Sequence, residues 1–138
     1  MPKPTLYNIF NSLVKAAKTT GIGNIYLTNA PSSGNKDVSQ FVVIALPSRL
    51  DRDVKGNDDF MVSTSGVFHI AVKAKSDNTP NIKAQTELVQ KFMDLFPIND
   101  DYIAATSPQI LINGDNKAGY QVTSIFFDIR TKINQFLK

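Results

Sequence analysis

The chain contains no cysteine and a single histidine, His69. Without thiols it can form no disulfide, thiolate nucleophile, zinc finger or iron–sulfur ligand set. The chain also lacks the Gly-x-Ser-x-Gly elbow of a nucleophilic serine, so His69 is predicted to be a packed or surface strand residue. We expect no catalytic residue, no metal site and no cofactor.

Long apolar runs and concentrated charge are missing too. No stretch approaches the ~20 apolar residues of a membrane span, and Lys15 and Lys18 interrupt any signal-peptide pattern. We therefore expect a soluble protein made in a cytoplasm, with no membrane partner. The net charge of +3 is spread along the chain. The small basic clusters that could face DNA are Lys73 with Lys75 and Arg130 with Lys132, and solvated strand ends are the simpler reading.

The length and composition predict one domain over residues 1–138. A chain of 138 residues can bury a single core, and 42% apolar with 20% charged residues is ordinary globular usage. Polar segments at 29–39 and 47–59 are predicted to be mobile or functional loops. Residues 133–138 form an apolar tail.

The spacing of apolar residues predicts two helices and about five strands. One helix ends before Gly21, and the other runs over 82–96, with Thr79 as its N-cap and Ile82 on its apolar arc. Strands are expected at 24–28, 41–46, 61–74, 109–113 and 120–132, with a linker at 98–106. Gly66 is expected to mark a bulge or bend. Phe126 breaks the alternation of the last strand and indicates a second covered face near the middle of that strand.

This order of elements, α-β-β-β-α-β-β, predicts an α+β fold. Both helices have one apolar stripe and need a partner surface, so the economical solution is a single, mostly antiparallel sheet with two helices on one face. The acidic segment from Asp51 onward has part of a calcium-loop pattern. Lys55 and Val62 occupy its fifth and twelfth positions, where oxygen ligands are required, so a hydrated loop is favoured.

Several features occur together in this chain: the order of elements, the strand from Gly66 to Val72, the covering helix, and a hairpin that ends Phe126, Phe127, Asp128, Ile129, Arg130. In this combination the chain resembles the tail-terminator and tail-completion proteins of tailed bacteriophages. The resemblance implies a structural, non-enzymatic virion protein, assembled in the host cytoplasm, that forms a ring at the neck or head–tail junction. Its partners would be further copies, in a hexamer or alternatively a dodecamer, and tail tube or connector proteins. Contact with the exiting DNA would be non-specific at most.

On this hypothesis two segments contact neighbouring subunits, because head-to-tail contacts that close into rings use protruding loops and apolar tails. The expected interface residues are Arg49, Asp51, Arg52, Asp53, Lys55, Ile133, Phe136 and Leu137. An adaptor or binding module that uses the groove between sheet and helix is the alternative. An enzyme dependent on His69 ranks third.

Overall fold

The computed structural model describes residues 6–27, 39–46, 51–52, 62–75, 79, 81–115 and 119–131. Its elements are α1 (Leu6–Lys18), β1 (Ile25–Leu27), β2 (Gln40–Ala45), β3 (Asp51–Arg52), β4 (Val62–Lys73), α2 (Ile82–Met93), β5 (Ile98–Asn99), β6 (Ile103–Asp115) and β7 (Tyr120–Thr131). The predicted loops lie outside the described residues, apart from Ser39 and the short strand β3. The predicted tail lies outside them entirely.

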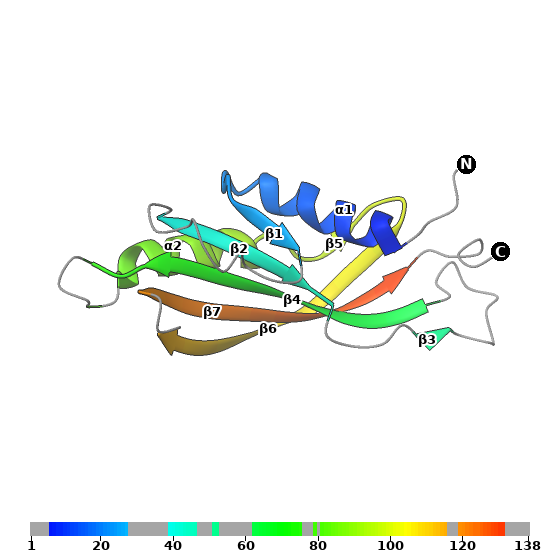
Figure 1. The fold of residues 1–138 in the computed structure, drawn as a ribbon. Helices are drawn as coiled ribbons and strands as arrows, with labels where there is room; N and C mark the ends of the chain where they lie inside the picture. The colour runs from blue at the N-terminus through cyan, green and yellow to red at the C-terminus, as the bar shows by residue number, and fades with distance from the viewer. Residues whose placement is uncertain are drawn as a thin grey trace.

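One sheet holds all the strands in the order β1-β2-β4-β7-β6-β5, and β3 pairs with β4 off this path (Figure 1). Among the described strands, only β1 and β2 pair in parallel. The predicted single, mostly antiparallel sheet is therefore confirmed, and the described residues form seven strands in place of about five. The added strands, β3 and β5, have two residues each, which is too short for a periodic pattern to show.

The predicted linker at 98–106 is wrong, because β5 and the start of β6 occupy it. Asp100 explains the tight connection between these strands. Its side-chain oxygen Oδ1 accepts hydrogen bonds from the backbone N–H groups of Tyr102 at 2.7 Å and Ile103 at 2.9 Å. Such side-chain capping of a turn is typical of Asp, and it lets the chain reverse without a Gly or Pro signal.

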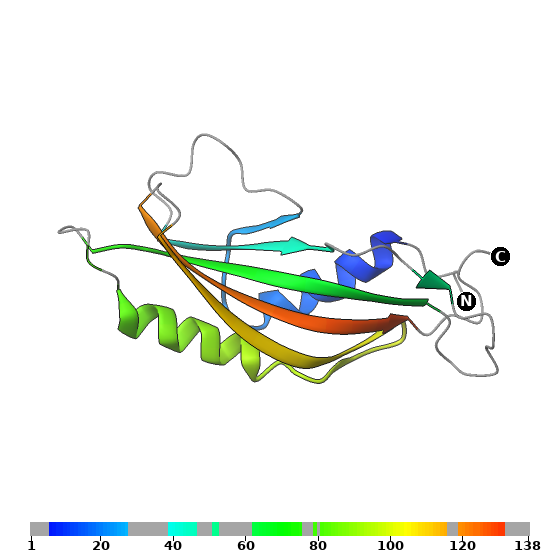
Figure 2. The same cartoon turned by 90° about the horizontal axis from the view of Figure 1, so that it is seen from below.

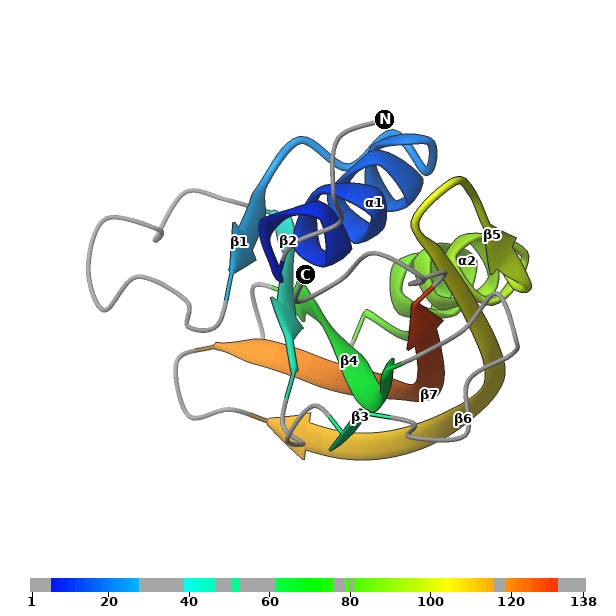
Figure 3. The same ribbon diagram turned by 90° about the vertical axis from the view of Figure 1, so that its right-hand side faces the viewer.

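Both helices lie on the same side of the curled sheet, as predicted (Figure 3). Their buried side chains and the facing strand residues form one core cluster. At its centre the rings of Phe68 and Phe92 are 5.1 Å apart, and those of Phe68 and Phe127 are 4.9 Å apart. These aromatic contacts join α2 to β4 and β7, so the strand–helix unit 66–96 is the centre of the fold.

Gly66 does not mark a bulge, because β4 pairs with β7 without a break from Val62 to Lys73. A Cβ at Gly66 would lie 2.8 Å from Cε2 of Phe127 and 2.9 Å from Cδ1 of Ile129. Glycine therefore makes room for a neighbouring strand's side chains. The irregularities of the sheet lie in β6 instead, between Thr106 and Gln109 and between Ile112 and Gly114.

The start of α2 also differs from the prediction. Asn81, not Thr79, is the N-cap, and its side-chain oxygen accepts a hydrogen bond from the Ala84 N–H at 3.3 Å. Ile82, predicted on the buried arc, is 66% exposed. The first turn of α2 extends past the packed core, so position on the apolar stripe does not ensure burial there.

The second face of the sheet carries a smaller buried cluster of Phe41, Val43, Ala71 and Tyr120. The rings of Phe41 and Tyr120 meet edge to face at 5.0 Å. The predicted second covered face therefore exists, but its cluster lies at the start of β7. Phe126 is only half-buried.

The long strands give the molecule two ends (Figure 2). At the hairpin end, Lys73 lies beside Tyr120, and α2 begins. At the terminal end, Val62 and Ile103 both lie beside Thr131, the last residue of β7.

Candidate interaction surfaces

The structure places only Asp51 and Arg52 among the predicted interface residues. They form β3, which pairs with Val62 and Ser63 at the terminal end of β4. The predicted loop is therefore attached to the sheet at this point. Arg49, Asp53, Lys55, Ile133, Phe136 and Leu137 lie outside the described residues.

The structure does not bring the predicted DNA-facing residues together. Lys73 and Lys75 are exposed at the hairpin end, while Arg130 is exposed and pairs with Ser63 near the terminal end. Ser63 and Lys73 lie ten residues apart on β4, or about 33 Å at the usual rise of a strand. These side chains form no single basic patch within one subunit. Lys132 lies outside the described residues.

An apolar groove of about 460 Å³ lies between α2 and the hairpin-end halves of β6 and β7. We call it the α2–β6 groove, and its lining residues are Ile82, Gln85, Thr86, Val89, Gln90, Met93, Ile110, Ile112, Gln121 and Thr123. The alternative prediction of a binding module placed its site in a groove between sheet and helix, but the sequence did not show which residues line such a groove or that they are exposed.

The geometry of β6 explains why this groove is open. Ile110 and Ile112 pair with Ile125 and Thr123, so they lie on the helix-covered side of the sheet. Helix α2 lies against β4 and β7, and the two isoleucines remain 48% and 77% exposed. Exposed apolar surface of this kind marks interaction sites in soluble proteins.

The same part of β6 is also a sheet edge. Strand β5 covers β6 only at Ala104 and Ala105. Within the described ranges, no strand pairs with the outer edge of β6 from Gln109 onward. On the other face of this strand, Leu111 is 51% exposed. The sequence did indicate this exposed apolar edge, because an Ile-Leu-Ile run places apolar side chains on both faces of a strand.

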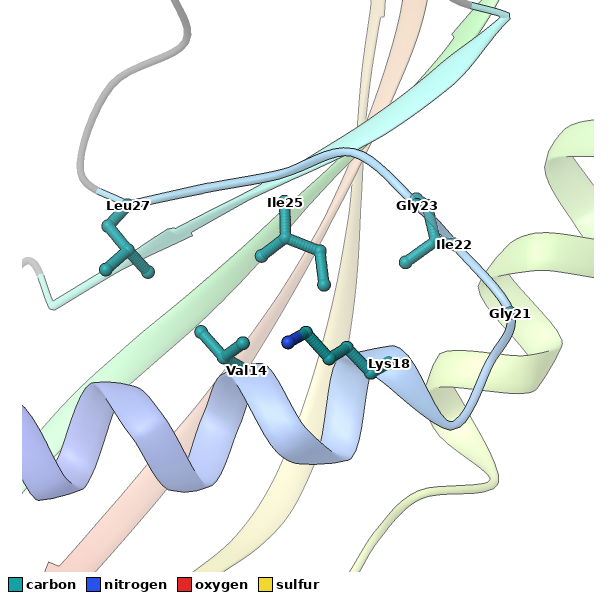
Figure 4. A pocket seen from close by; sticks show the side chains of 7 residues that line it. All are labelled: Val14, Lys18, Gly21, Ile22, Gly23, Ile25 and Leu27. Carbon is teal, nitrogen blue, oxygen red and sulfur yellow. The ribbon is translucent and has the colours of Figure 1, made fainter.

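A second pocket, of about 570 Å³, lies between the end of α1 and β1 (Figure 4). Its walls include Val14, Ile22, Ile25 and Leu27, and the Lys18 side chain extends across it toward Val14 and Ile25. Gly21, with a φ of 89°, turns the chain from α1 into this wall. This pocket and the α2–β6 groove both lie between a helix and the sheet, where the alternative prediction placed a binding groove.

His69 contacts one potential nucleophile. Its Nδ1 lies 2.7 Å from Oγ of Ser124 on the neighbouring strand β7. Ser124 is 0% exposed, so no substrate can reach its hydroxyl in this conformation. Burial lowers the pKa of His69 below its ordinary value of 6.5, which favours the neutral ring. The arrangement fits a buried polar cross-strand contact.

Over the described part of the chain, no group of three or more His, Asp or Glu side chains could hold a metal ion. Neither described helix is long and apolar enough to cross a membrane.

No protein-family model matches the sequence, and no curated protein matches it. Solved structures do match the fold. One chain that carries no functional name aligns with a TM-score of 0.59 and 9% identity, over 91% of this chain and 94% of its own length. A chain from the virion of a native gene transfer agent particle aligns with a TM-score of 0.54 and 9% identity, over 89% of this chain and 90% of that chain.

The chain shares its fold with that virion chain. The match spans nearly the whole of both chains, so the resemblance predicted from the order of elements is confirmed at the level of the fold. A sheath/tube terminator from an extracellular contractile injection system aligns at a TM-score of 0.44 and 8% identity, over 95% of this chain and 57% of that chain. That score does not by itself establish a common fold.

Proposed function

We propose that the protein is a structural component of a phage-type tail, a tail-terminator or tail-completion subunit that forms a ring at the neck. The observation that carries the proposal is the fold shared with a virion chain over about nine tenths of both chains. The open α2–β6 groove, an apolar surface that a monomer would leave in water, supports it.

The position of this surface suits ring formation. A heterologous contact joins one patch of a subunit to a different patch of the next, and it closes into a ring when the rotation allows. The groove lies at the hairpin end, and both β3 and the end of β7 lie at the other end. Contact of opposite ends favours a cyclic assembly, a hexamer in the first instance or a dodecamer.

The ring would surround the path of exiting DNA and contact tail tube or connector proteins. Because Lys73 and Arg130 lie far apart on each subunit, DNA contact would be diffuse and non-specific. The protein would belong to the virion, after assembly in the cytoplasm of the bacterial host. We assign no catalytic role, and a turnover screen in which His69→Ala abolished an activity would contradict this assignment.

The test is direct visualisation. The purified protein, alone and mixed with tail tube protein, is scored for rings by negative-stain electron microscopy, and native mass spectrometry counts the subunits. Rings of six or twelve subunits support the proposal. Monomer in both samples at concentrations of about 100 μM, well above the Kd of a typical specific interface, would contradict it.

An adaptor or binding module remains the second candidate, and the α1–β1 pocket favours it. Its volume of about 570 Å³ lies in the range of small-ligand sites. A fragment screen by NMR would favour this reading if ligands shifted the Ile22 and Ile25 signals of a protein that forms no ring.

A further inference from the structure

The outer end of the α2–β6 groove is the most exposed apolar surface among the described residues. Ile82 is 66% exposed and Ile112 is 77% exposed, on either side of the groove. Inside the groove the Gln85 amide donates a hydrogen bond to the Thr123 hydroxyl, which fixes α2 against β7. The groove is therefore formed before any partner arrives, and its apolar floor has uncharged amide groups around it.

A short segment with apolar anchors follows Thr131, the last residue of β7, in the sequence. Residues 132–138 read Lys-Ile-Asn-Gln-Phe-Leu-Lys, with Ile133, Phe136 and Leu137 spaced three and then one apart. This is the spacing of anchors on one face of a helical turn, the pattern with which amphipathic segments enter apolar grooves.

In a helical conformation the segment of one subunit would not reach the outer end of its own groove. Ile112 lies beside Thr123, which is eight residues before Thr131 on β7, or about 26 Å at the usual rise of a strand. Phe136 follows Thr131 by five residues, and in the helical turn that the anchor spacing predicts these residues span only about 8 Å. A helical segment that contacts the Ile82–Ile112 end therefore comes from another copy.

We propose that the α2–β6 groove of one subunit binds residues 133–137 of the next copy of the chain. This inference rests on the proposed ring-forming function and names the contact that builds the ring. The isoleucines of the groove take up Ile133, Phe136 and Leu137, while Gln85, Gln90 and Gln121 face the polar side chains of the segment. The groove lies at the hairpin end and the segment follows Thr131, which lies at the terminal end, so each subunit offers both halves of the contact, as a heterologous interface requires.

Site-directed cross-linking tests the contact. Because the chain has no native cysteine, each variant carries a single thiol at the chosen position. One preparation carries Thr86→Cys, on the exposed rim of the groove, and the other carries Gln135→Cys, between the apolar anchors. The two are mixed and treated with a short bis-maleimide, and mass spectrometry identifies the joined peptides. We expect a link between residues 86 and 135 in the mixture. Glu87→Cys is the matched control, because it is exposed on the same helix but does not line the groove.

A second measurement follows assembly without a cross-linker. Ile112→Ser should weaken self-association by about tenfold or more, because it removes the most exposed isoleucine of the groove. Leu111→Ser changes the adjacent exposed residue on the other face and should leave association unchanged. Both variants should keep the wild-type melting temperature of the monomer, since neither side chain belongs to the core.

The outcomes separate this inference from the proposed function. Rings that form with no 86–135 link, or a groove that cross-links only to tail tube protein, would overturn the inference and leave the proposed function standing. Equal effects of Ile112→Ser and Leu111→Ser would also overturn it. Monomer under all conditions would overturn both.

Discussion

The contact between Gly66 and the ring of Phe127 gives the sharpest test of the fold. In Gly66→Ala the added Cβ would meet Cε2 and Cζ of Phe127 at 2.8 and 2.9 Å, and Cδ1 of Ile129 at 2.9 Å. The Phe127 ring cannot simply swing away. It is 2% exposed, and its centroid lies 4.9 Å from that of Phe68 and 5.1 Å from that of Phe96.

Two opposing effects set the size of the change. Forcing a methyl group into a filled core costs about 1–3 kcal/mol. Replacing Gly with Ala inside a strand stabilises the folded state by about 0.5–1 kcal/mol, because alanine loses less conformational entropy on folding than glycine does. The net prediction is a loss of about 1–2 kcal/mol in the free energy of unfolding, or a fall of about 3–7 °C in melting temperature for a chain of this length. Urea denaturation followed by circular dichroism measures it.

A matched control and a rescue make this prediction refutable. Gly23→Ala should be neutral or slightly stabilising, because a Cβ there meets nothing within 4 Å. Adding Phe127→Leu to Gly66→Ala should reduce the cost of the alanine, with a coupling of at least about 0.5 kcal/mol in a double-mutant cycle. If Gly66→Ala is as stable as wild type, or if its cost does not change with Phe127→Leu, the steric explanation is wrong.

Three further predictions concern the core, the helix cap and pH. Phe92→Ala should lower the free energy of unfolding by about 3–5 kcal/mol, since the Phe92 side chain is 0% exposed. Ile82→Ala, at an exposed position on the same helix, should change it by less than about 0.5 kcal/mol. Equal losses for the two variants in urea titrations would contradict the assigned core. Asn81→Ala should cost about 0.5–2 kcal/mol by the same assay, and Thr79→Ala should cost less if Asn81 is the cap. The pKa of His69 is lower in the folded protein than its ordinary value of 6.5, so the unfolded state binds more protons as the pH falls below 6.5. The stability contributed by the neutral ring is therefore present above pH 6.5 and is lost as the pH falls through the pKa of the folded state. His69→Gln should reduce the loss of stability between pH 7.5 and 5.5, and an unchanged slope would show that burial of His69 does not cause it.

The parts of the fold that could be predicted are those in which one physical requirement dominates. Strand β4 and helix α2 each place a long apolar face against the same core, so their periods of two and of 3.6 survive in the sequence. The Asp100 turn had no such signal. An Asp in a polar stretch resembles a solvated loop residue, and only the structure shows its carboxylate bonded to the Ile103 N–H. Likewise, nothing local distinguishes a Gly that bends a strand from one that, as at position 66, leaves space for Phe127.

The exposed lining of the α2–β6 groove could not be predicted for a more general reason. Apolar periodicity shows which side chains favour burial, but it does not show whether the burial occurs inside one subunit or between two. Ile82 continues the stripe that Val89 and Phe92 bury, yet only the latter two belong to the core. An apolar side chain that lies on the apolar stripe of a helix or strand and is nevertheless exposed therefore indicates an interaction site. Its spacing favours burial, but no residue of the same subunit covers it. By this reasoning Ile82 and Ile112 point to an intersubunit contact more strongly than the charged residues around β3 do, since solvated charges would be stable without any neighbour.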